Sequence, residues 1–118
     1  MKRFALSLAV LVGIIAGLSA CDEQTTVQMA IQESFPEQST HAKAVRVADC
    51  ESDLNPRAVS AGGKNHGLFQ INSVHKPTVE RMGYKWDQIY DPYVNAKVAR
   101  KLFNDAGKSW APWGCRNA

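Results

Sequence analysis

The stretch that decides the fold is residues 50–72, which read CESDLNPRAVSAGGKNHGLFQIN. The pair Asn55-Pro56 ends any helix before it, because a residue that precedes proline disfavours helical backbone. Residues 61–67 are rich in glycine and asparagine, so they predict a turn-rich loop or a small hairpin. A short apolar run over 68–72 follows. We therefore expect an α-rich domain with at most a small β element.

Helical patterns flank this stretch on both sides. Thr40 is a candidate N-cap for a helix that runs to about residue 50. Asp91-Pro92 predicts the start of a second helix, with Asp as the N-cap and proline at the first helical position. Gly107 stands where a glycine commonly ends such a helix. A shorter helix is expected over 77–82.

Length and composition fit this reading. The chain has 118 residues, of which 45% are hydrophobic and 21% charged, so it offers material for one domain. This composition excludes collagen-like, coiled-coil and wholly disordered chains. The predicted fold class is mainly α with at most a short β-hairpin, in one globular domain over residues 39–118.

The first twenty residues have the pattern of an export signal. Met1-Lys2-Arg3 is a short basic start, and residues 4–18 are almost wholly apolar but shorter than a membrane-spanning helix requires. The sequence Leu18-Ser19-Ala20-Cys21 resembles the bacterial lipobox. That resemblance implies lipidation of Cys21, an anchor in a membrane, and a place in the cell envelope facing the periplasm or cell wall. Asp22 resembles an inner-membrane retention signal.

Residues 21–38 are interpreted as a flexible tether, because they are polar and acidic and lack a long apolar period. The block from residue 41 onward carries 12 Lys and Arg against 7 Asp and Glu. Such a basic surface suits an anionic polymer such as cell wall or nucleic acid, and a charge that serves solubility alone is the alternative. No nucleic-acid-binding motif accompanies it, so nucleic acid is not an expected partner.

The cysteines indicate an oxidising compartment. With Cys21 assigned to lipid, Cys50 and Cys115 remain as a pair in a small exported domain. A disulfide between them would stabilise the fold by about 4 kcal/mol on the chain-entropy model. Two unpaired buried thiols are the alternative. The histidines and cysteines have no metal-site spacing, and no motif for a cofactor is found.

Glu51 is the candidate for acid catalysis. It lies at the end of the first predicted helix, where the negative end of the helix dipole disfavours an ionised carboxylate. Apolar neighbours would raise its pKa further. A carboxyl protonated near neutrality is what general-acid cleavage of a glycosidic bond requires. From these arguments alone, a solvated surface glutamate remains the alternative.

Several pieces of the sequence resemble one enzyme superfamily. Residues 50–52, Asn55-Pro56, residues 58–60 and the run GLFQIN over 67–72 are similar to motifs of lysozymes and soluble-type lytic transglycosylases. The ending WAPWGC over 110–115 resembles that of resuscitation-promoting factors, which are minimal wall-cleaving domains. The resemblance implies an α+β lysozyme-like fold and peptidoglycan glycan strands as the substrate, cleaved at the β-1,4 bond between MurNAc and GlcNAc.

The resemblance also implies roles for individual residues. Glu51 matches the catalytic acid. Residues matched to the substrate-binding surface are Ser60, Phe69, Gln70, Asn72 and Trp113. An amide such as that of Asn72 both donates and accepts, as recognition of an N-acetyl group requires. A plain core position is the alternative for Phe69, and packing beneath the disulfide is the alternative for Trp113.

The departures from the pattern concern the mechanism. Asn65 stands where animal-type lysozymes carry an aspartate, and Asp53 and Asp87 are the unplaced candidates for a second carboxylate. Retaining hydrolysis needs two carboxylates. The resemblance therefore favours the single-carboxylate route of transglycosylases, which forms a 1,6-anhydro ring. Lysozyme-type hydrolysis and a non-catalytic wall-binding module stay open as alternatives, and a monomer is expected.

Overall fold

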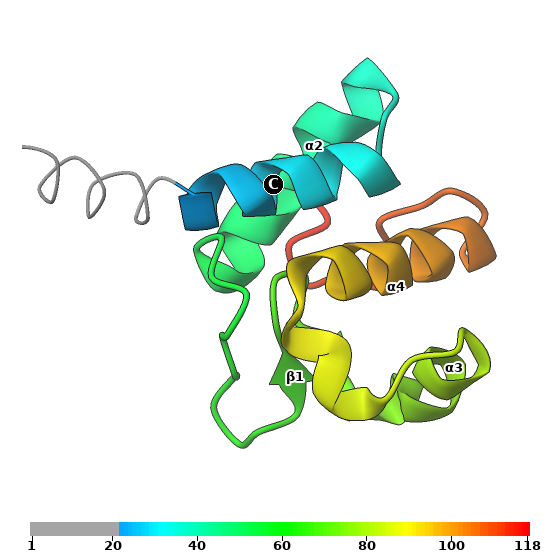
Figure 1. The fold of residues 1–118 in the computed structure, drawn as a ribbon. Helices are drawn as coiled ribbons and strands as arrows, with labels where there is room; N and C mark the ends of the chain where they lie inside the picture. The colour runs from blue at the N-terminus through cyan, green and yellow to red at the C-terminus, as the bar shows by residue number, and fades with distance from the viewer. Residues whose placement is uncertain (1–21) are drawn as a thin grey trace, which may run out of the picture.

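The computed structural model describes residues 22–118 and shows a mainly helical domain with one small sheet (Figure 1). The predicted signal over 1–20 and the predicted lipidation site Cys21 lie outside the described residues. A first helix covers residues 22–34. The elements after it are α2 (Gln38–Ser52), β1 (Asn65–His66), β2 (Ile71–Asn72), η1 (Ser73–His75), α3 (Lys76–Arg81), η2 (Trp86–Tyr90) and α4 (Pro92–Asp105). The predicted fold class is confirmed.

Helix α2 places the candidate acid at its C-terminal end. The helix begins two residues before the predicted Thr40 cap, at Gln38, and Glu37 precedes it without a side-chain cap. Its buried face is small, with Ala44, Val47 and Ala48 against the core. Asp53 follows in the left-handed region, with a φ of 55°, so the helix stops immediately after Glu51 and Ser52.

Helix α4 begins as the sequence predicts. The Asp91 carboxylate accepts hydrogen bonds from the backbone N–H groups of Tyr93 at 2.8 Å and Val94 at 3.4 Å, and Pro92 occupies the first turn. These caps satisfy amides that a helix start otherwise leaves unpaired. The face toward the core contains Val94, Ala96, Val98, Ala99 and Phe103.

The predicted hairpin forms between β1 and β2. The strands are antiparallel, with Asn65 opposite Asn72 and His66 opposite Ile71. Gly67 in the connection has a φ of +79°, and a Cβ atom there would collide with the amide nitrogen of Asn95. Glycine is therefore required at this position, both for its backbone conformation and for its lack of a side chain.

Asn95 holds the hairpin connection against α4. This side chain is fully buried, and its amide nitrogen donates to the carbonyl oxygens of His66 at 3.0 Å and Ile89 at 2.9 Å. Its side-chain oxygen accepts from the Phe69 N–H at 2.7 Å. One buried amide thus satisfies three backbone groups, which fixes the segment that carries Gln70 and Asn72.

The prediction of a flexible tether over 21–38 is wrong for the described residues. Residues 22–34 form a helix whose Val27, Ile31 and following Phe35 are fully buried in the same hydrophobic core as α2 and α4. These side chains recur every four residues, so they share one helix face. Burial of that face stabilises the helix despite its polar composition, and the domain therefore begins no later than residue 22.

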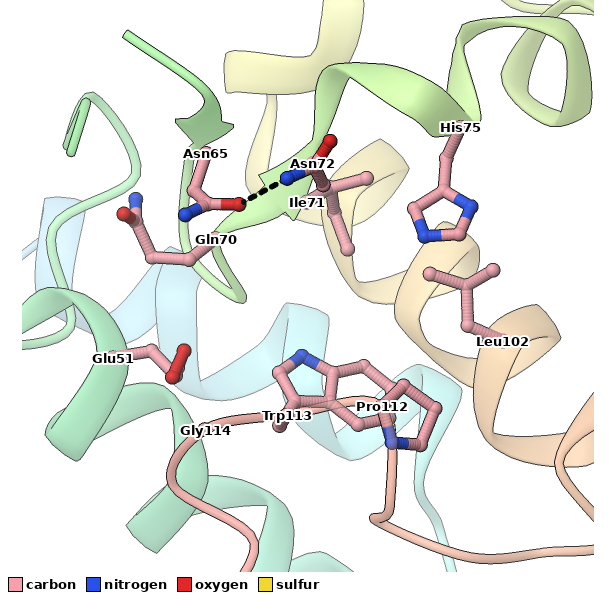
Figure 2. A pocket seen from close by; sticks show the side chains of 10 residues that line it. All are labelled: Glu51, Asn65, Gln70, Ile71, Asn72, His75, Leu102, Pro112, Trp113 and Gly114. Carbon is pink, nitrogen blue, oxygen red and sulfur yellow. Dashed lines mark hydrogen bonds between the residues drawn. The ribbon is translucent and has the colours of Figure 1, made fainter. Parts of the chain in front are cut away.

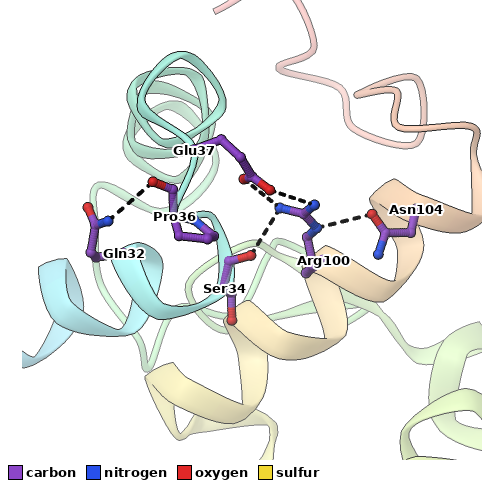
Figure 3. Close-up of polar contacts among 6 residues, drawn as sticks. All are labelled: Gln32, Ser34, Pro36, Glu37, Arg100 and Asn104. Carbon is purple, nitrogen blue, oxygen red and sulfur yellow. Dashed lines mark hydrogen bonds and ion pairs between the residues drawn. The ribbon is translucent and has the colours of Figure 1, made fainter.

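A polar cluster ties the end of this first helix to α4. The Arg100 guanidinium donates to both carboxylate oxygens of Glu37, at 2.8 and 3.1 Å, and to the Ser34 carbonyl oxygen at 3.3 Å (Figure 3). Its side chain also lies over the rings of Phe35 and Phe103. The two terminal nitrogens of the Arg100 guanidinium match the two oxygens of the Glu37 carboxylate. This paired contact holds the connection between the first helix and α2 in one orientation.

Aromatic side chains and a disulfide close the C-terminal segment onto the core. The Phe35 ring lies 5.2 Å from the ring of Trp110, which lies 5.2 Å from that of Trp113. Cys50 and Cys115 form a disulfide, with Cα atoms 6.1 Å apart. The predicted pairing is confirmed, and the bridge fixes the segment over 110–115 beside the end of α2.

Candidate active site

A cavity of about 280 Å³ lies between the end of α2, the hairpin and the C-terminal segment (Figure 2). Glu51 lies on one side, and His75 and Leu102 lie at the opposite end. Elements far apart in the sequence therefore meet at one hollow. The residues that line it are Glu51, Asn65, Gln70, Ile71, Asn72, His75, Leu102, Pro112, Trp113 and Gly114.

Glu51 is the only acidic side chain that lines this cavity within the described part of the chain. Burial raises the pKa of its carboxyl above the usual range, while a hydrogen bond from the Cys115 backbone acts in the opposite direction. The Cα of Gly114 is so close that a Cβ there would lie 3.6 Å from a Glu51 carboxyl oxygen. The backbone around the disulfide thus forms the wall beside the carboxyl group and limits its hydration.

The cavity has two chemically different walls. Asn65, Asn72 and Gln70 bring amide groups from the hairpin, while Leu102, Pro112 and Trp113 form apolar surface (Figure 2). A pyranose ring has the same division, since its hydroxyl and acetamido groups radiate from an apolar ring face. Such a combination of polar donors and flat apolar surface is typical of small-molecule sites.

Asn65 and Asn72 form a pair of amides across the hairpin. The Asn72 amide nitrogen donates to the Asn65 side-chain oxygen at 3.1 Å, and the Asn72 side-chain oxygen accepts from the Val74 N–H at 3.0 Å. These bonds fix both side chains before any ligand arrives. The Asn65 amide nitrogen makes no hydrogen bond among the described residues, so it offers two protons to a ligand.

Gln70 lines the cavity in an unusual backbone conformation. Its φ is 51°, in the left-handed region that non-glycine residues rarely adopt. Its amide nitrogen donates to the carbonyl oxygens of Ala58 at 3.1 Å and Gly67 at 3.0 Å. The side chain therefore supports the loop as well as lining the cavity, and its amide oxygen is the atom left for a ligand.

Two residues predicted to bind substrate have other roles. The side chain of Phe69 is fully buried in the core, so the prediction that it contacts substrate is wrong. Ser60 does not line the cavity, and its hydroxyl oxygen accepts from the Asn65 N–H at 3.1 Å within the loop. Both residues support the hairpin and its loop, and neither side chain lines the cavity.

Trp113 both packs and lines the cavity. Only 4% of it is exposed, and its indole N–H donates to the Phe69 carbonyl oxygen at 3.0 Å. The remaining surface forms part of the cavity wall. Trp113 therefore packs in the core and lines the cavity, in a position fixed by a buried hydrogen bond, and its contact with substrate stays a prediction.

Ser52 couples the candidate acid to the hairpin. Its buried hydroxyl lies 2.6 Å from the Leu68 carbonyl oxygen and 2.9 Å from the Ala48 carbonyl oxygen. Because the hydroxyl has one proton, it donates to one of them at a time, and the shorter contact joins α2 to the loop. Glu51 is thus held on a helix end that is fixed both by this contact and by the disulfide.

Three further cavity residues, His75, Leu102 and Pro112, had no sequence signal that pointed to a binding or catalytic role. Burial lowers the pKa of His75, which favours its neutral form. Leu102 belongs to the apolar period of α4, which pointed only to a core position. Asp53 and Asp87 do not line the cavity, and within residues 22–118 no group of three His, Cys, Asp or Glu side chains could hold a metal ion.

Comparison with protein families identifies the fold. Residues 11–115 match the family model described as "Lysozyme like domain". The chain belongs to this lysozyme-like family. The match covers most of the chain, including α2, the hairpin and α4, so the cavity described above lies within the family's domain.

Two curated relatives are similar over part of their length. Protein IpgF of Shigella flexneri is 32% identical over 80 residues, which cover 61% of this chain and 53% of the relative. Invasion protein IagB of Salmonella typhimurium is also 32% identical over 80 residues, which cover 61% of this chain and 50% of the relative. The chain thus spans about half the length of these relatives. No solved structure matches it significantly.

Proposed function

We propose that this protein is a lytic transglycosylase that cleaves the β-1,4 bond between MurNAc and GlcNAc in peptidoglycan. The observation that carries the proposal is the position of Glu51, which among residues 22–118 is the single carboxyl group lining a cavity with amides on one side and apolar surface on the other. Membership of the lysozyme-like family supports it. An N-acetylated glycan fits both walls.

In the first step Glu51 acts as a general acid. Its raised pKa favours a protonated carboxyl at a higher pH than a solvated glutamate allows. The carboxyl proton passes to the glycosidic oxygen as the bond from that oxygen to C1 of MurNAc breaks. The GlcNAc-containing product leaves with a hydroxyl group, and Glu51 becomes a carboxylate.

In the second step the same carboxylate acts as a base. It accepts the proton of the MurNAc C6 hydroxyl while that oxygen forms a bond to C1, which closes the 1,6-anhydro ring and restores the Glu51 acid. No second carboxylate and no water molecule enters this balance. This suits a cavity in which Asn65 occupies the position that an aspartate holds in animal-type lysozymes, since an amide cannot act as a carboxylate nucleophile.

Product analysis tests the proposal directly. Purified sacculi are digested with the wild type, Glu51→Gln and a matched control, Glu80→Gln, which removes an exposed carboxylate from α3. We expect 1,6-anhydro products from the wild type and the control, and a loss of at least a hundredfold for Glu51→Gln. Reducing-end products would instead favour lysozyme-type hydrolysis. Undiminished cleavage by Glu51→Gln would contradict the assignment of the acid.

We also propose a lipid anchor at Cys21 and a location in the cell envelope, with the inner membrane favoured by Asp22. Because the helix over 22–34 packs on the domain, such an anchor would hold the domain close to the membrane, without a long flexible linker between them. None of the helices described between residues 22 and 118 is long and apolar enough to cross a bilayer. A Cys21→Ser variant should move to the soluble periplasmic fraction, and continued membrane association would refute the anchor.

A further inference from the structure

We propose that a basic groove beside the cavity binds free carboxylates of peptidoglycan stem peptides. The groove has a volume of about 420 Å³. Its lining contains three cationic side chains and no acidic side chain among the described residues. The residues that line it are Lys43, Lys108, Ser109, Trp110, Ala111, Arg116 and Asn117. The proposal rests on the function proposed above and extends its substrate from the glycan to the attached peptide.

The cations keep donors that the fold does not use. Lys108 is exposed on a loop whose φ of 57° at this residue holds it in the left-handed region. Arg116 is exposed, and one terminal nitrogen donates to the Trp113 carbonyl oxygen at 3.2 Å, which leaves the rest of the fork available. Lys43 donates to the Ala118 backbone oxygen at 2.9 Å and has two further protons.

Glu37 does not neutralise the groove. Its pKa is lowered chiefly by Arg100, which pairs with both of its carboxylate oxygens, and less by the charge of Lys108. Arg46 adds a further cation near the Ala118 backbone oxygen, to which its side chain donates at 3.4 Å. Lys108 and Arg116 form no ion pair with a side-chain carboxylate of the described residues, so a carboxylate ligand would meet attraction from both of them.

The groove and the catalytic cavity share one segment of chain. Pro112, Trp113 and Gly114 line the cavity, while Trp110 and Ala111 before them, and Arg116 and Asn117 after Cys115, line the groove. The Cys115 disulfide and the packing of Trp110 on Trp113 hold this segment in place. A substrate lying in the cavity with a branch that passes over this segment would reach the cations of the groove.

The chemistry of peptidoglycan identifies the occupant. The GlcNAc–MurNAc backbone offers hydroxyl and acetamido groups, so a cationic groove has no counterpart on the glycan chain itself. The stem peptides attached to MurNAc carry free carboxylates. Lysine and arginine recognise carboxylates through charge-assisted hydrogen bonds, which are the strongest contacts available to an exposed polar site. Charge complementarity therefore selects the peptide branch.

A binding experiment separates this proposal from the catalytic one. All proteins carry Glu51→Gln, so binding is measured without cleavage, and the parent is compared with Lys108→Gln/Arg116→Gln. The control Lys97→Gln/Arg81→Gln removes one lysine and one arginine that lie outside the groove, on α4 and α3. Each protein is sedimented with native sacculi and with sacculi whose carboxyls have been converted to amides.

We expect the groove variant to bind native sacculi about threefold to tenfold more weakly than the parent at low salt, with the difference shrinking as salt is added. On amidated sacculi, groove variant, control and parent should bind equally. Four outcomes would each overturn the proposal. The groove variant could lose binding equally on native and amidated sacculi, or lose no binding on native sacculi. The parent could fail to bind, or the groove variant could lose binding only to vesicles of anionic lipid. Failure of wild-type cleavage would refute the catalytic proposal without affecting this result.

Discussion

Substitution of Phe35 tests whether the segment before α2 belongs to the folded domain. The side chain is fully buried, and its ring lies 5.7 Å from that of Phe69 and 5.8 Å from that of Phe103. Truncation of a buried phenylalanine to alanine costs about 3–5 kcal/mol, because both the transferred area and the packing are lost. For a domain of this size, that lowers Tm by roughly 15–30 °C.

The measurement is urea unfolding of the disulfide-bonded chain, followed by tryptophan fluorescence and far-ultraviolet circular dichroism. The matched control is Met29→Ala, because Met29 lies in the same helix but is 57% exposed. We expect the control to change stability by less than about 0.5 kcal/mol. If Phe35→Ala cost no more than the control, residues 22–37 would not share the cooperative core, and the flexible-tether interpretation would regain its support.

Three further perturbations test the site and its supports. Gly67→Ala should destabilise the domain by about 2–4 kcal/mol in urea unfolding, because it adds a strained φ and a collision with Asn95; an unchanged midpoint would contradict this. Replacing Cys50 and Cys115 with alanine should cost about 2–5 kcal/mol by the same measurement and weaken wall cleavage; wild-type values for both would refute the role of the bridge. Because burial raises the Glu51 pKa in the folded state, its carboxyl favours folding at acid pH, and that contribution disappears as pH rises from the usual carboxyl range through the raised pKa. Glu51→Gln lacks this loss, so its Tm relative to wild type should increase over that interval, and a pH-independent difference would contradict the assignment.

The elements that depend on local signals could be predicted from the sequence. Asp91 and Pro92 mark a helix start through capping and backbone geometry alone, and α4 begins there. The hairpin follows from the glycine-rich loop. The family resemblance over residues 50–72 points to Glu51 as the candidate acid, and Glu51 lines the cavity. The helix over 22–34 was missed because its apolar period is short and lies among polar residues. The repeat of Val27 and Ile31, with Phe35 one turn later, was the available signal.

The lining of the cavity was harder to predict than the fold. The positive φ of Gln70 and the turn at Gly67 decide which side chains of the run GLFQIN face inward, and sequence spacing does not show these angles. Phe69 therefore points into the core, although Gln70, Ile71 and Asn72 after it line the cavity. His75 comes from a single 3₁₀ turn that no periodic pattern marks, so only the three-dimensional arrangement places it opposite Glu51.

The close approach of Gly67 to the Asn95 amide has a consequence for how this domain can change over evolutionary time. The two positions are 28 residues apart in the chain, yet neither can be exchanged without a cost. A larger residue at 67 needs the space that the amide fills. A smaller residue at 95 leaves three backbone groups without their hydrogen-bond partner. A Cβ at position 67 would also lie 2.8 Å from the Ile89 carbonyl oxygen, so descendants that lose the amide should still keep the glycine. A family member with a side chain at the first position and asparagine at the second would have to route its loop differently.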